Sequence, residues 1–310
     1  MTHPRVLVVV ITYNGEHWIR HCLGSLQQSK LPVSVLVVDN QSTDDTVMII
    51  KKDFPEVQLI ESSENLGFGR GNNVGMKKAL DENYDYAFLL NQDAWIDPDT
   101  VETLIEVHQK YPEYGIISPL HLNRTETKLD RNFANYLCQA NNLELMSDLL
   151  VPNSATQDIY TVGFVNAAAW FLSQECLQAV GGFDPLFPHY GEDQDYVQRV
   201  VYYGYKVGVT PRTKIIHDRE GYTKQSQMHR TLAIQYNGSL ILLKNVNRPL
   251  HTNVLVVLKN EVFEALAALL TRDTEQFVIK MKLLRKLMLQ YFTIRRHRKY
   301  CATRERVFLT

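Results

Sequence analysis

Apolar runs of strand length recur along the first 220 residues of this chain, and four of them lead into clusters of acidic, amide or imidazole side chains. The four clusters are Asp39-Asn40, Asn91-Gln92-Asp93, Glu192-Asp193 and His217-Asp218. In an open α/β sheet, ligands bind outside the carboxyl ends of the strands. We interpret each cluster as the end of a strand, and the pattern therefore predicts one ligand site at one edge of a sheet.

Strand-like and helix-like segments alternate through the first part of the chain. The predicted strands are 6–12, 33–38, 57–61, 84–90 and 116–118, and the predicted helices are 16–28, 42–52, 71–83 and 97–111. Continuous β-branched runs such as 6–12 are typical of buried parallel strands. This βαβ order predicts a mainly parallel, doubly wound α/β sheet.

The second part of the chain is less regular. Residues 121–159 are polar and lack a clear period, so we expect loops and short elements there. The remaining predicted strands are 162–172, 207–210 and 215–216, and the predicted helices are 173–180 and 192–203. Past residue 222 only helical patterns remain.

Composition limits the class of protein. With 310 residues, 45% of them hydrophobic and 22% charged, the chain suits one large globular domain, alone or with an appendage. A net charge of −1 gives the whole chain no general attraction to nucleic acid. Four scattered cysteines without metal-ligand spacing indicate reduced, cytoplasmic thiols. The apolar run at 6–11 is too short to span a bilayer.

Thr12-Tyr13-Asn14 follows the first predicted strand, and Asp39 follows the second. In a doubly wound sheet these two ends are neighbours at the nucleotide-binding crevice. A carboxylate there accepts a hydrogen bond from a base or a ribose, and an aromatic ring stacks on the base. The alternative is that Asp39 belongs to a plain strand-to-helix turn, because Asx residues favour turns.

Residues 65–73 form a glycine-rich segment that we expect to be a loop entering a helix at residue 71. Glycines let the backbone approach a phosphate or a sugar, the helix N-terminus favours an anion, and Arg70 would add a charge to a diphosphate. The segment lacks the Gly-Lys-Ser/Thr of a Walker motif, and it follows the third strand rather than the first as in a Rossmann fingerprint. An ordinary turn is the alternative.

Asn91-Gln92-Asp93 ends an apolar strand with oxygen ligands that suit Mg²⁺ or Mn²⁺. Asp93 is the expected direct ligand, and Asn91 a weaker ligand or a sugar contact. His217 follows a short apolar run and is a candidate further ligand through a neutral imidazole. The alternatives are a solvated turn and a structural histidine.

Glu192-Asp193 opens a predicted helix after an aromatic loop at 183–190. Acids in a first helical turn complement the helix dipole, which is a purely structural explanation. A carboxylate held beside an aromatic wall also suits the deprotonation of an acceptor hydroxyl.

Together these motifs resemble the family 2 glycosyltransferases with a GT-A fold, in particular their bacterial rhamnosyltransferase-like branch. The matching stretches are 10–14, 37–44, 65–73, 90–93, 181–184 and 192–195, in the family's order over about residues 5–220. The chain departs from the family's Asp-x-Asp metal motif by carrying Asn91 at the first position.

The resemblance implies an inverting, Mn²⁺- or Mg²⁺-assisted transfer of one sugar from a nucleotide-diphosphate donor, either dTDP-rhamnose or a UDP-sugar. The implied acceptor is a hydroxyl of a surface polysaccharide or of a lipid-linked saccharide. The implied donor-contacting residues are Thr12, Tyr13, Asn14, Asp39, Asn65, Gly67, Phe68, Arg70, Asn72, Asn91 and Gln92. Asp93 and His217 are the implied metal ligands. Asp193 is the implied catalytic base, with Glu192 as the alternative.

The resemblance also implies a domain organisation. A GT-A domain would cover residues 1–222, with a nucleotide-sugar half at 1–118 and an acceptor half at 119–222, and a helical C-terminal appendage would cover 223–310.

Within the C-terminal region, an apolar stretch at 254–270 precedes basic stretches at 280–289 and 295–299. Apolar and basic residues interleaved at helical spacing bind the surface of an anionic bilayer, which predicts peripheral contact with the inner face of the cytoplasmic membrane. The alternative is that these helices pack on the core or on a second subunit, so a homodimer stays open. Nucleic acid is not an expected partner, because the region has no recognition motif.

Two other functions stay open. A sugar nucleotidyltransferase usually carries a glycine- and basic-rich loop directly after its first strand, where this chain has Thr12-Tyr13-Asn14-Gly15-Glu16. A non-catalytic sugar-nucleotide-binding scaffold protein would explain Asn91 as the loss of a metal ligand.

Overall fold

The computed structural model describes residues 3–138, 142–151, 156–188, 190–219, 227–303 and 305–309. Its strands are β1 Val6–Thr12, β2 Ser34–Asp39, β3 Gln58–Glu61, β4 Tyr86–Asn91, β5 Ala94–Ile96, β6 Tyr114–Leu122, β7 Tyr160–Thr161, β8 Ala169–Ser173 and β9 Lys206–His217. Its helices are α1 Ile19–Gln27, α2 Thr46–Asp53, α3 Gly67–Asp81, α4 Thr100–Lys110, α5 Arg131–Cys138, α6 Leu143–Leu150, α7 Gln174–Val180, α8 Glu192–Tyr202, α9 Gln227–Lys244, α10 Leu250–Leu270 and α11 Thr274–Thr303.

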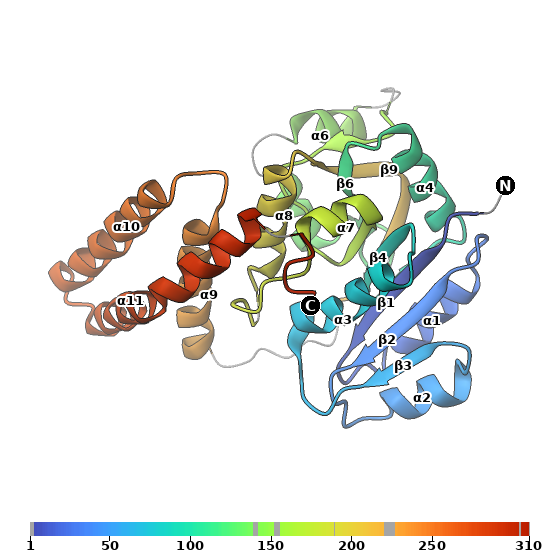
Figure 1. Ribbon diagram of the computed structural model, residues 1–310, viewed down its shortest axis with the longest axis horizontal. Coiled ribbons are helices and arrows are strands. Elements are labelled where there is room, and N and C mark those ends of the chain that lie inside the picture. The colour runs from blue at the N-terminus through green and yellow to red at the C-terminus, as the bar shows by residue number, and fades with distance from the viewer. Residues whose placement is uncertain are drawn as a thin grey trace.

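All of the described strands join one sheet, in the order β3-β2-β1-β4-β8-β6-β9-β5, with β7 beside β9. The first four are parallel, and β1 is buried on both faces. Leu7 and Val9 face a core formed with α3, α7 and α8, whereas Val8 and Val10 face a second core formed with α1, α2 and α4. The sheet is therefore covered by helices on both faces, as the βαβ order predicts (Figure 1).

The other half of the sheet is mixed. Strand β8 runs antiparallel to both β4 and β6, and β9 runs parallel to β6. The predicted strand at 162–172 is wrong in its first half, because β7 ends at Thr161 and the chain turns beneath Trp170, whose Nε1 donates to the Val165 carbonyl. The two predicted strands at 207–210 and 215–216 are one strand, β9, whose register shifts after Thr210, next to Pro211. Proline cannot donate to the ladder, so a break in register there is expected.

Helix α3 begins at Gly67, four residues before the predicted start at residue 71. The predicted glycine-rich loop is therefore mostly the first two turns of this helix. The Oδ1 of Asn65 accepts a hydrogen bond from the Gly67 N–H at 2.9 Å, and Gly67 has a φ of 72° that favours glycine. The later glycines lie where α3 presses against other elements, Gly71 on Ile11 of β1 and Gly69 on Phe183.

We predict that Gly75→Ala destabilises the fold. A Cβ at this position would lie 2.3 Å from a methyl carbon of Val9, which is fully buried in the middle of the sheet. Overpacking of this kind costs about 1–3 kcal/mol, more than the gain of about 1 kcal/mol that alanine brings to a helix. Urea unfolding should show a lower free energy of unfolding. Gly24→Ala in α1 is the matched control, since no atom lies within 4 Å of its Cβ position, and it should be neutral or stabilising. Equal stability of the two variants would contradict the packing argument.

The C-terminal region consists of α9 and a hairpin of α10 and α11 that projects away from the sheet (Figure 1). After α11 the chain returns to the α/β core, beside α3 and α7. The Gly182 N–H donates to the Val307 carbonyl at 2.8 Å, and Leu309 is buried in the core cluster with α3 and α7. The predicted boundary at residue 222 lies outside the described residues. Among the described helices, none combines the length and the apolar composition that a membrane span requires.

Candidate active site

Three of the four predicted clusters meet at one edge of the sheet. The strand registers place Thr12 beside Asp39 and Ile11 beside Asn91. His217, the last residue of β9, joins them because it pairs with Ala94 of β5, which follows β4 in the chain. The fourth cluster, Glu192-Asp193, does not end a strand, so that part of its interpretation is wrong. It begins α8, in agreement with the predicted helix at 192–203, after Gly191 in a left-handed conformation with φ of 93°.

The Asp39 carboxylate holds the turn between β2 and α2. Its Oδ1 accepts hydrogen bonds from Thr12 Oγ1 at 2.8 Å and Ser42 Oγ at 2.5 Å, and its Oδ2 accepts the Ser42 N–H at 2.9 Å. These bonds explain why α2 begins at Thr46 rather than at the predicted residue 42. This is the turn geometry of the structural alternative, and a nucleoside contact through Asp39 stays a prediction.

The loop after β1 presents an exposed aromatic ring at this edge. The side-chain amide of Gln92 accepts from the Tyr13 N–H at 3.0 Å and donates to the Tyr13 carbonyl at 3.2 Å. The Asn14 Oδ1 accepts the Thr43 N–H at 2.8 Å. Gln92 and Asn14 are thus engaged in holding the backbone, while the ring of Tyr13 is 49% exposed and available for stacking.

The predicted donor-contacting residues of α3 make mainly internal contacts. Asn72 is buried and donates to the Phe68 carbonyl at 3.0 Å, and the Phe68 ring packs edge-to-face on Phe183 at 5.6 Å. Arg70 is exposed and pairs with Glu64 at 3.3 Å. Their roles toward a donor therefore stay predictions, and the contacts described here give them structural roles.

The predicted metal ligands are adjacent. The Oδ1 of Asp93 lies 3.4 Å from the Nε2 of His217, and both residues are buried. The side-chain amide of Asn91 lies 3.5 Å from the same Nε2. The proximity follows from the pairing of β5 with β9, where the Asp218 N–H also donates to the Asp93 carbonyl at 2.8 Å.

Sequence reasoning missed the residues behind His217. The Oδ2 of Asp130 lies 4.0 Å from the Nδ1 of His217 and 2.7 Å from the Nε of Arg219. The ring of His121 lies edge-on to His217 at 6.0 Å, and burial lowers the pKa of His121, which keeps this neighbour neutral. The one sequence signal for this region was Asp130, an acid just before a helical segment. Its Oδ1 accepts the Phe133 N–H at the start of α5.

This donor set fits a divalent cation. The Asp93 carboxylate lies in the turn between β4 and β5 and approaches the imidazole at the end of β9. A second carboxylate, that of Asp130, lies behind the imidazole, on the side where histidine ligands of metals usually have one. Among the residues that the structure describes, no group of three or more His, Cys, Asp and Glu side chains is placed to hold a metal ion. The remaining coordination positions would therefore need oxygens from a ligand.

The two carboxylates of α8 are electrostatically strained. Burial, and then the charge of Asp193, raise the pKa of Glu192 to about 8, and burial raises the pKa of Asp193 to about 6. Within the described part of the chain, the Oε2 of Glu192 has no hydrogen-bond partner. The Cβ of Glu192 lies 3.8 Å from the Cβ position of Gly69, so Glu192 faces the start of α3. A raised pKa is what a general base near neutral pH requires.

Tyr136 of α5 links the two clusters. Burial, and then the negative charge of Asp193, raise the pKa of Tyr136, and the charges of Arg219 and Asp130 act on the same phenol. One side chain is therefore within electrostatic reach of both the α8 carboxylates and the residues behind His217.

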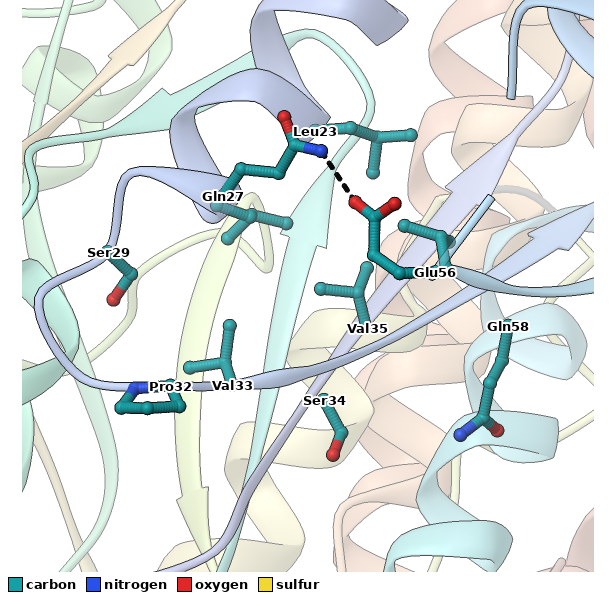
Figure 2. Close-up of a pocket in the computed structure, with 11 residues that line it drawn as sticks. Leu23, Gln27, Ser29, Pro32, Val33, Ser34, Val35, Glu56 and Gln58 are labelled. Atoms are coloured by element: carbon teal, nitrogen blue, oxygen red, sulfur yellow. Dashed lines mark hydrogen bonds between the residues drawn. The ribbon is translucent and has the colours of Figure 1, made fainter. Parts of the chain in front are cut away.

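A cavity of about 460 Å³ lies elsewhere, at the start of β2 between α1 and the approach to β3 (Figure 2). Its lining includes Gln27 and Glu56, whose side chains are hydrogen-bonded at 2.5 Å. Because Asp39 ends β2, this cavity is at the opposite end of that strand from the predicted site, and it contains none of the predicted site residues.

The fold and the site define a sugar transferase of the GT-A type, and comparison with known proteins supports this class. The family model for glycosyl transferase family 2 matches residues 7–161. The chain belongs to this family and is a glycosyltransferase, which confirms the resemblance read from the motifs.

Two curated relatives are transferases that are matched over most of their length. An N-acetylglucosaminyl-diphospho-decaprenol L-rhamnosyltransferase of Mycobacterium tuberculosis is 24% identical over 255 residues, which cover 76% of this chain and 83% of the relative. A low-salt glycan biosynthesis hexosyltransferase of Haloferax volcanii is 21% identical over 257 residues, which cover 81% of each chain.

Solved structures support the fold. The S. aureus TarS 1-349 structure in complex with UDP-GlcNAc has a TM-score of 0.57 and 16% identity, and the match covers 82% of this chain and 71% of that one. GalNAc-T7 with UDP, GalNAc and Mn²⁺ has a TM-score of 0.57 and 13% identity, and the match covers 77% of this chain and 47% of that one. At these identities the likeness shows the fold alone, and it confirms the predicted GT-A architecture with a helical C-terminal region.

Proposed function

We propose that this chain is an inverting glycosyltransferase that moves one sugar from a nucleotide-diphosphate donor to a hydroxyl of a saccharide acceptor. The observation that carries the proposal is the Asp93–His217 pair, which lies at the sheet edge where β1, β2 and β4 end. Residues 1–118 would bind the donor and residues 119–222 the acceptor, with 223–310 as the helical region.

The names of the relatives narrow the substrates. The Mycobacterium tuberculosis relative is named for rhamnose transfer to a diphospho-decaprenol saccharide, and the TarS structure contains UDP-GlcNAc. The donor proposed here is accordingly dTDP-rhamnose or a UDP-sugar. The proposed acceptor is a lipid-linked saccharide or a growing surface polysaccharide.

Asp193 is the proposed base, with Glu192 as the alternative. The carboxylate takes the proton of the acceptor hydroxyl while that oxygen attacks the anomeric carbon from the side opposite the leaving diphosphate. The attack inverts the anomeric configuration, and holding both substrates in line supplies a large part of the rate. The shared burial of Glu192 and Asp193 supports this role, because it keeps a proton-accepting carboxylate poised near neutral pH.

Asp93 and His217 would hold a divalent cation, Mn²⁺ or Mg²⁺, with Asn91 beside it. When bound, the cation would neutralise charge on the leaving diphosphate. Asp130 would orient the His217 ring from behind, and the exposed Arg219, which pairs with Asp130, would contact a phosphate oxygen. The fit of the pair to a cation rests on its 3.4 Å separation and its burial.

A transfer assay tests the proposal. The full chain would be incubated with Mn²⁺, one donor among dTDP-rhamnose, UDP-GlcNAc, UDP-galactose and GDP-mannose, and a water-soluble N-acetylglucosaminyl-diphosphate lipid analogue. Mass spectrometry should detect one added sugar with a single donor. Binding of a nucleotide without consumption of any donor would instead favour the scaffold alternative, and formation of a nucleotide sugar from a sugar phosphate would favour the nucleotidyltransferase.

We also propose contact with an anionic bilayer through the α10–α11 hairpin. A groove of about 630 Å³ between these helices is lined almost wholly by apolar side chains. The large apolar residues exposed on the hairpin are Leu255, Leu258, Val262, Phe263, Leu266, Leu269, Leu270, Val278, Met281, Met288, Leu289 and Phe292. The acidic residue of α11 is Glu275. The exposed basic residues of α11 are Lys282, Arg285, Lys286, Arg295, Arg296 and Lys299. A second copy of the chain would bring two such basic faces together, whereas an anionic membrane complements them.

We expect the full chain to float with vesicles that contain phosphatidylglycerol and to remain unbound with phosphatidylcholine alone. Phe263→Asp with Leu270→Asp should reduce flotation more than tenfold, because each removes exposed apolar area and adds a charge that anionic lipid repels. Leu143→Asp with Leu150→Asp is the matched control, since these exposed leucines lie on α6. Unchanged flotation of the α10 double variant, or a dimer in sedimentation that the same variant dissolves, would contradict the proposal.

A further inference from the structure

A cluster of buried charges lies beneath the start of α8. The Nζ of Lys244 is 2.6 Å from Asp184 Oδ2 and 3.9 Å from Asp195 Oδ1, and the Nδ1 of His297 is 2.7 Å from Asp184 Oδ1. Arg199 closes the cluster, with its Nε 2.9 Å from Asp195 Oδ2. Lys244, Asp184, Asp195 and Arg199 are each at most 1% exposed. None of them belongs to the proposed chemistry.

The cluster joins two different parts of the chain. Lys244 ends α9 and His297 belongs to α11, so both come from the C-terminal helical region. Asp184 lies in the loop that leads to α8, and Asp195 is in the first turn of α8, two residues after Asp193. The cluster therefore ties the C-terminal helices to the helical turn that carries the proposed base.

Other residues on the same face of α9 contact the same turn. Asn237 Nδ2 donates to the Tyr190 carbonyl at 2.7 Å, and a Cβ at Gly191 would lie 3.0 Å from Ile241 Cδ1. Asn237, Ile241 and Lys244 are spaced by four and three residues, which places them on one face of a helix. This face of α9 contacts Tyr190 and Gly191 before the two carboxylates, Glu192 and Asp193, and Asp195 after them.

Losing one member of this cluster should cost more stability than the intact cluster contributes. A buried ion pair adds little net stability, but removing one partner leaves an uncompensated buried charge. Burial alone would raise the pKa of Asp184, yet the hydrogen bond from His297 and the charge of Lys244 hold that pKa below its ordinary value. The loop and the first turn of α8 are thus stable in this position only while α9 supplies the charge of Lys244 and α11 supplies the hydrogen bond of His297.

We infer that Lys244 and His297 are positioning residues for sugar transfer, which fix the first turn of α8 so that the Asp193 carboxylate meets the acceptor hydroxyl. The inference rests on the proposed function, because it assigns the C-terminal helices a part in the acceptor side of that site. A displacement of about 1 Å in a reacting group lowers the rate by about 10²-fold. Donor binding should be insensitive to the cluster, since the donor site is built at the ends of β1, β2 and β4.

The test compares Lys244→Met with Lys280→Met in the full chain. Lys280 is the matched control, because it is 2% exposed and its Nζ pairs with Glu261 at 2.7 Å and Glu264 at 2.5 Å in the α10–α11 hairpin, outside the cluster. Three quantities are measured for each: the thermal midpoint, amide hydrogen exchange across residues 190–196, and kcat with the soluble acceptor beside the dissociation constant for UDP and dTDP.

For Lys244→Met we expect exchange across 190–196 to accelerate at least tenfold and kcat to fall about 10²-fold, with nucleotide affinity within twofold of wild type. Lys280→Met should lower the thermal midpoint comparably and change neither exchange nor kcat. Unchanged exchange in Lys244→Met, or equal losses of kcat in the two variants, would overturn the inference. If Lys244→Met does not accumulate as folded protein, His297→Gln decides by the same criteria, with a smaller expected loss of kcat of about threefold to tenfold.

Exchange is measured without turnover, so it shows whether Lys244 fixes the first turn of α8 even if the wild-type chain transfers no sugar. Faster exchange together with an inactive wild type would refute the proposed function, and with it a role in sugar transfer, while it would still show that Lys244 fixes the first turn of α8. Faster exchange with full kcat in an active enzyme would refute the positioning role.

Discussion

Asp193→Asn should lower kcat for sugar transfer by about 10³-fold while changing nucleotide affinity less than twofold. Asparagine is close in shape but accepts no proton, so the acceptor hydroxyl would attack without a base. Asp193 is half-buried at the start of α8, and its Oδ1 accepts the Gln194 N–H at 2.9 Å, a contact that asparagine can retain. The measurement is steady-state kinetics with the soluble acceptor, accompanied by calorimetric titration of the nucleotide.

Glu192→Gln is the comparison that identifies the base. If Asp193 accepts the proton, Glu192→Gln should retain most of kcat; a loss as large as that of Asp193→Asn would mean that the two carboxyls act as a unit, and full turnover by Asp193→Asn would contradict the assignment.

The pH dependence of kcat tests the assignment of Asp193 as the base independently of the substitutions. A base acts in its ionised form, and burial raises the pKa of Asp193 to about 6. Activity should therefore fall as the pH drops through about 6, rather than near 4 where an exposed aspartate titrates.

Asp93→Asn should weaken the metal-dependent part of nucleotide binding by at least about tenfold. The substitution removes the charged ligand and leaves His217 beside a neutral amide, so a divalent cation would lose its main electrostatic attraction at the sheet edge. Calorimetry of UDP and dTDP, each with Mn²⁺ and with EDTA, measures the effect.

Asp99→Asn serves as the control for Asp93→Asn, because Asp99 is exposed and its contact with Lys30 is a weak surface pair at 3.8 Å. Asp93→Asn protein that binds nucleotide as tightly as wild type in the presence of Mn²⁺ would contradict the metal-ligand role.

The sheet and its edge could be predicted from the sequence because the signals are local. Apolar runs define β1, β2 and β4, and the polar residues that end them are brought together by parallel register. The sequence predicted Asp93 and His217 as ligands of one metal, but it did not predict the strand pairing that brings them into contact. That pairing joins residues more than 100 positions apart, which periodicity does not report.

In the glycine-rich segment, composition alone does not predict the secondary structure correctly. Gly67 to Gly75 favour a loop by propensity, yet they form a helix because that helix packs against β1 and Phe183 at distances that only glycine allows. Tertiary packing here outweighs a helix propensity that is worth only about 1 kcal/mol per glycine. Asn73 completes the same contact, since its amide bonds both the N–H and the carbonyl of Phe183.

The buried charges beneath α8 could not be predicted. Lys244 and His297 lie in helices whose sequence reads as basic and amphipathic, and nothing local distinguishes them from the exposed lysines and arginines nearby. Their partners Asp184 and Asp195 lie in a motif of the family, but the pairing depends on how the C-terminal helices return to the core.

The central claim is a metal-assisted nucleotide site at the carboxyl edge of the sheet. Its most direct test is calorimetric titration of the wild-type chain with UDP, dTDP and GDP, each in Mn²⁺ and in EDTA. We predict that one nucleotide binds, and that EDTA abolishes or strongly weakens the binding. Absence of binding by all three nucleotides, or binding that EDTA leaves unchanged, would contradict it.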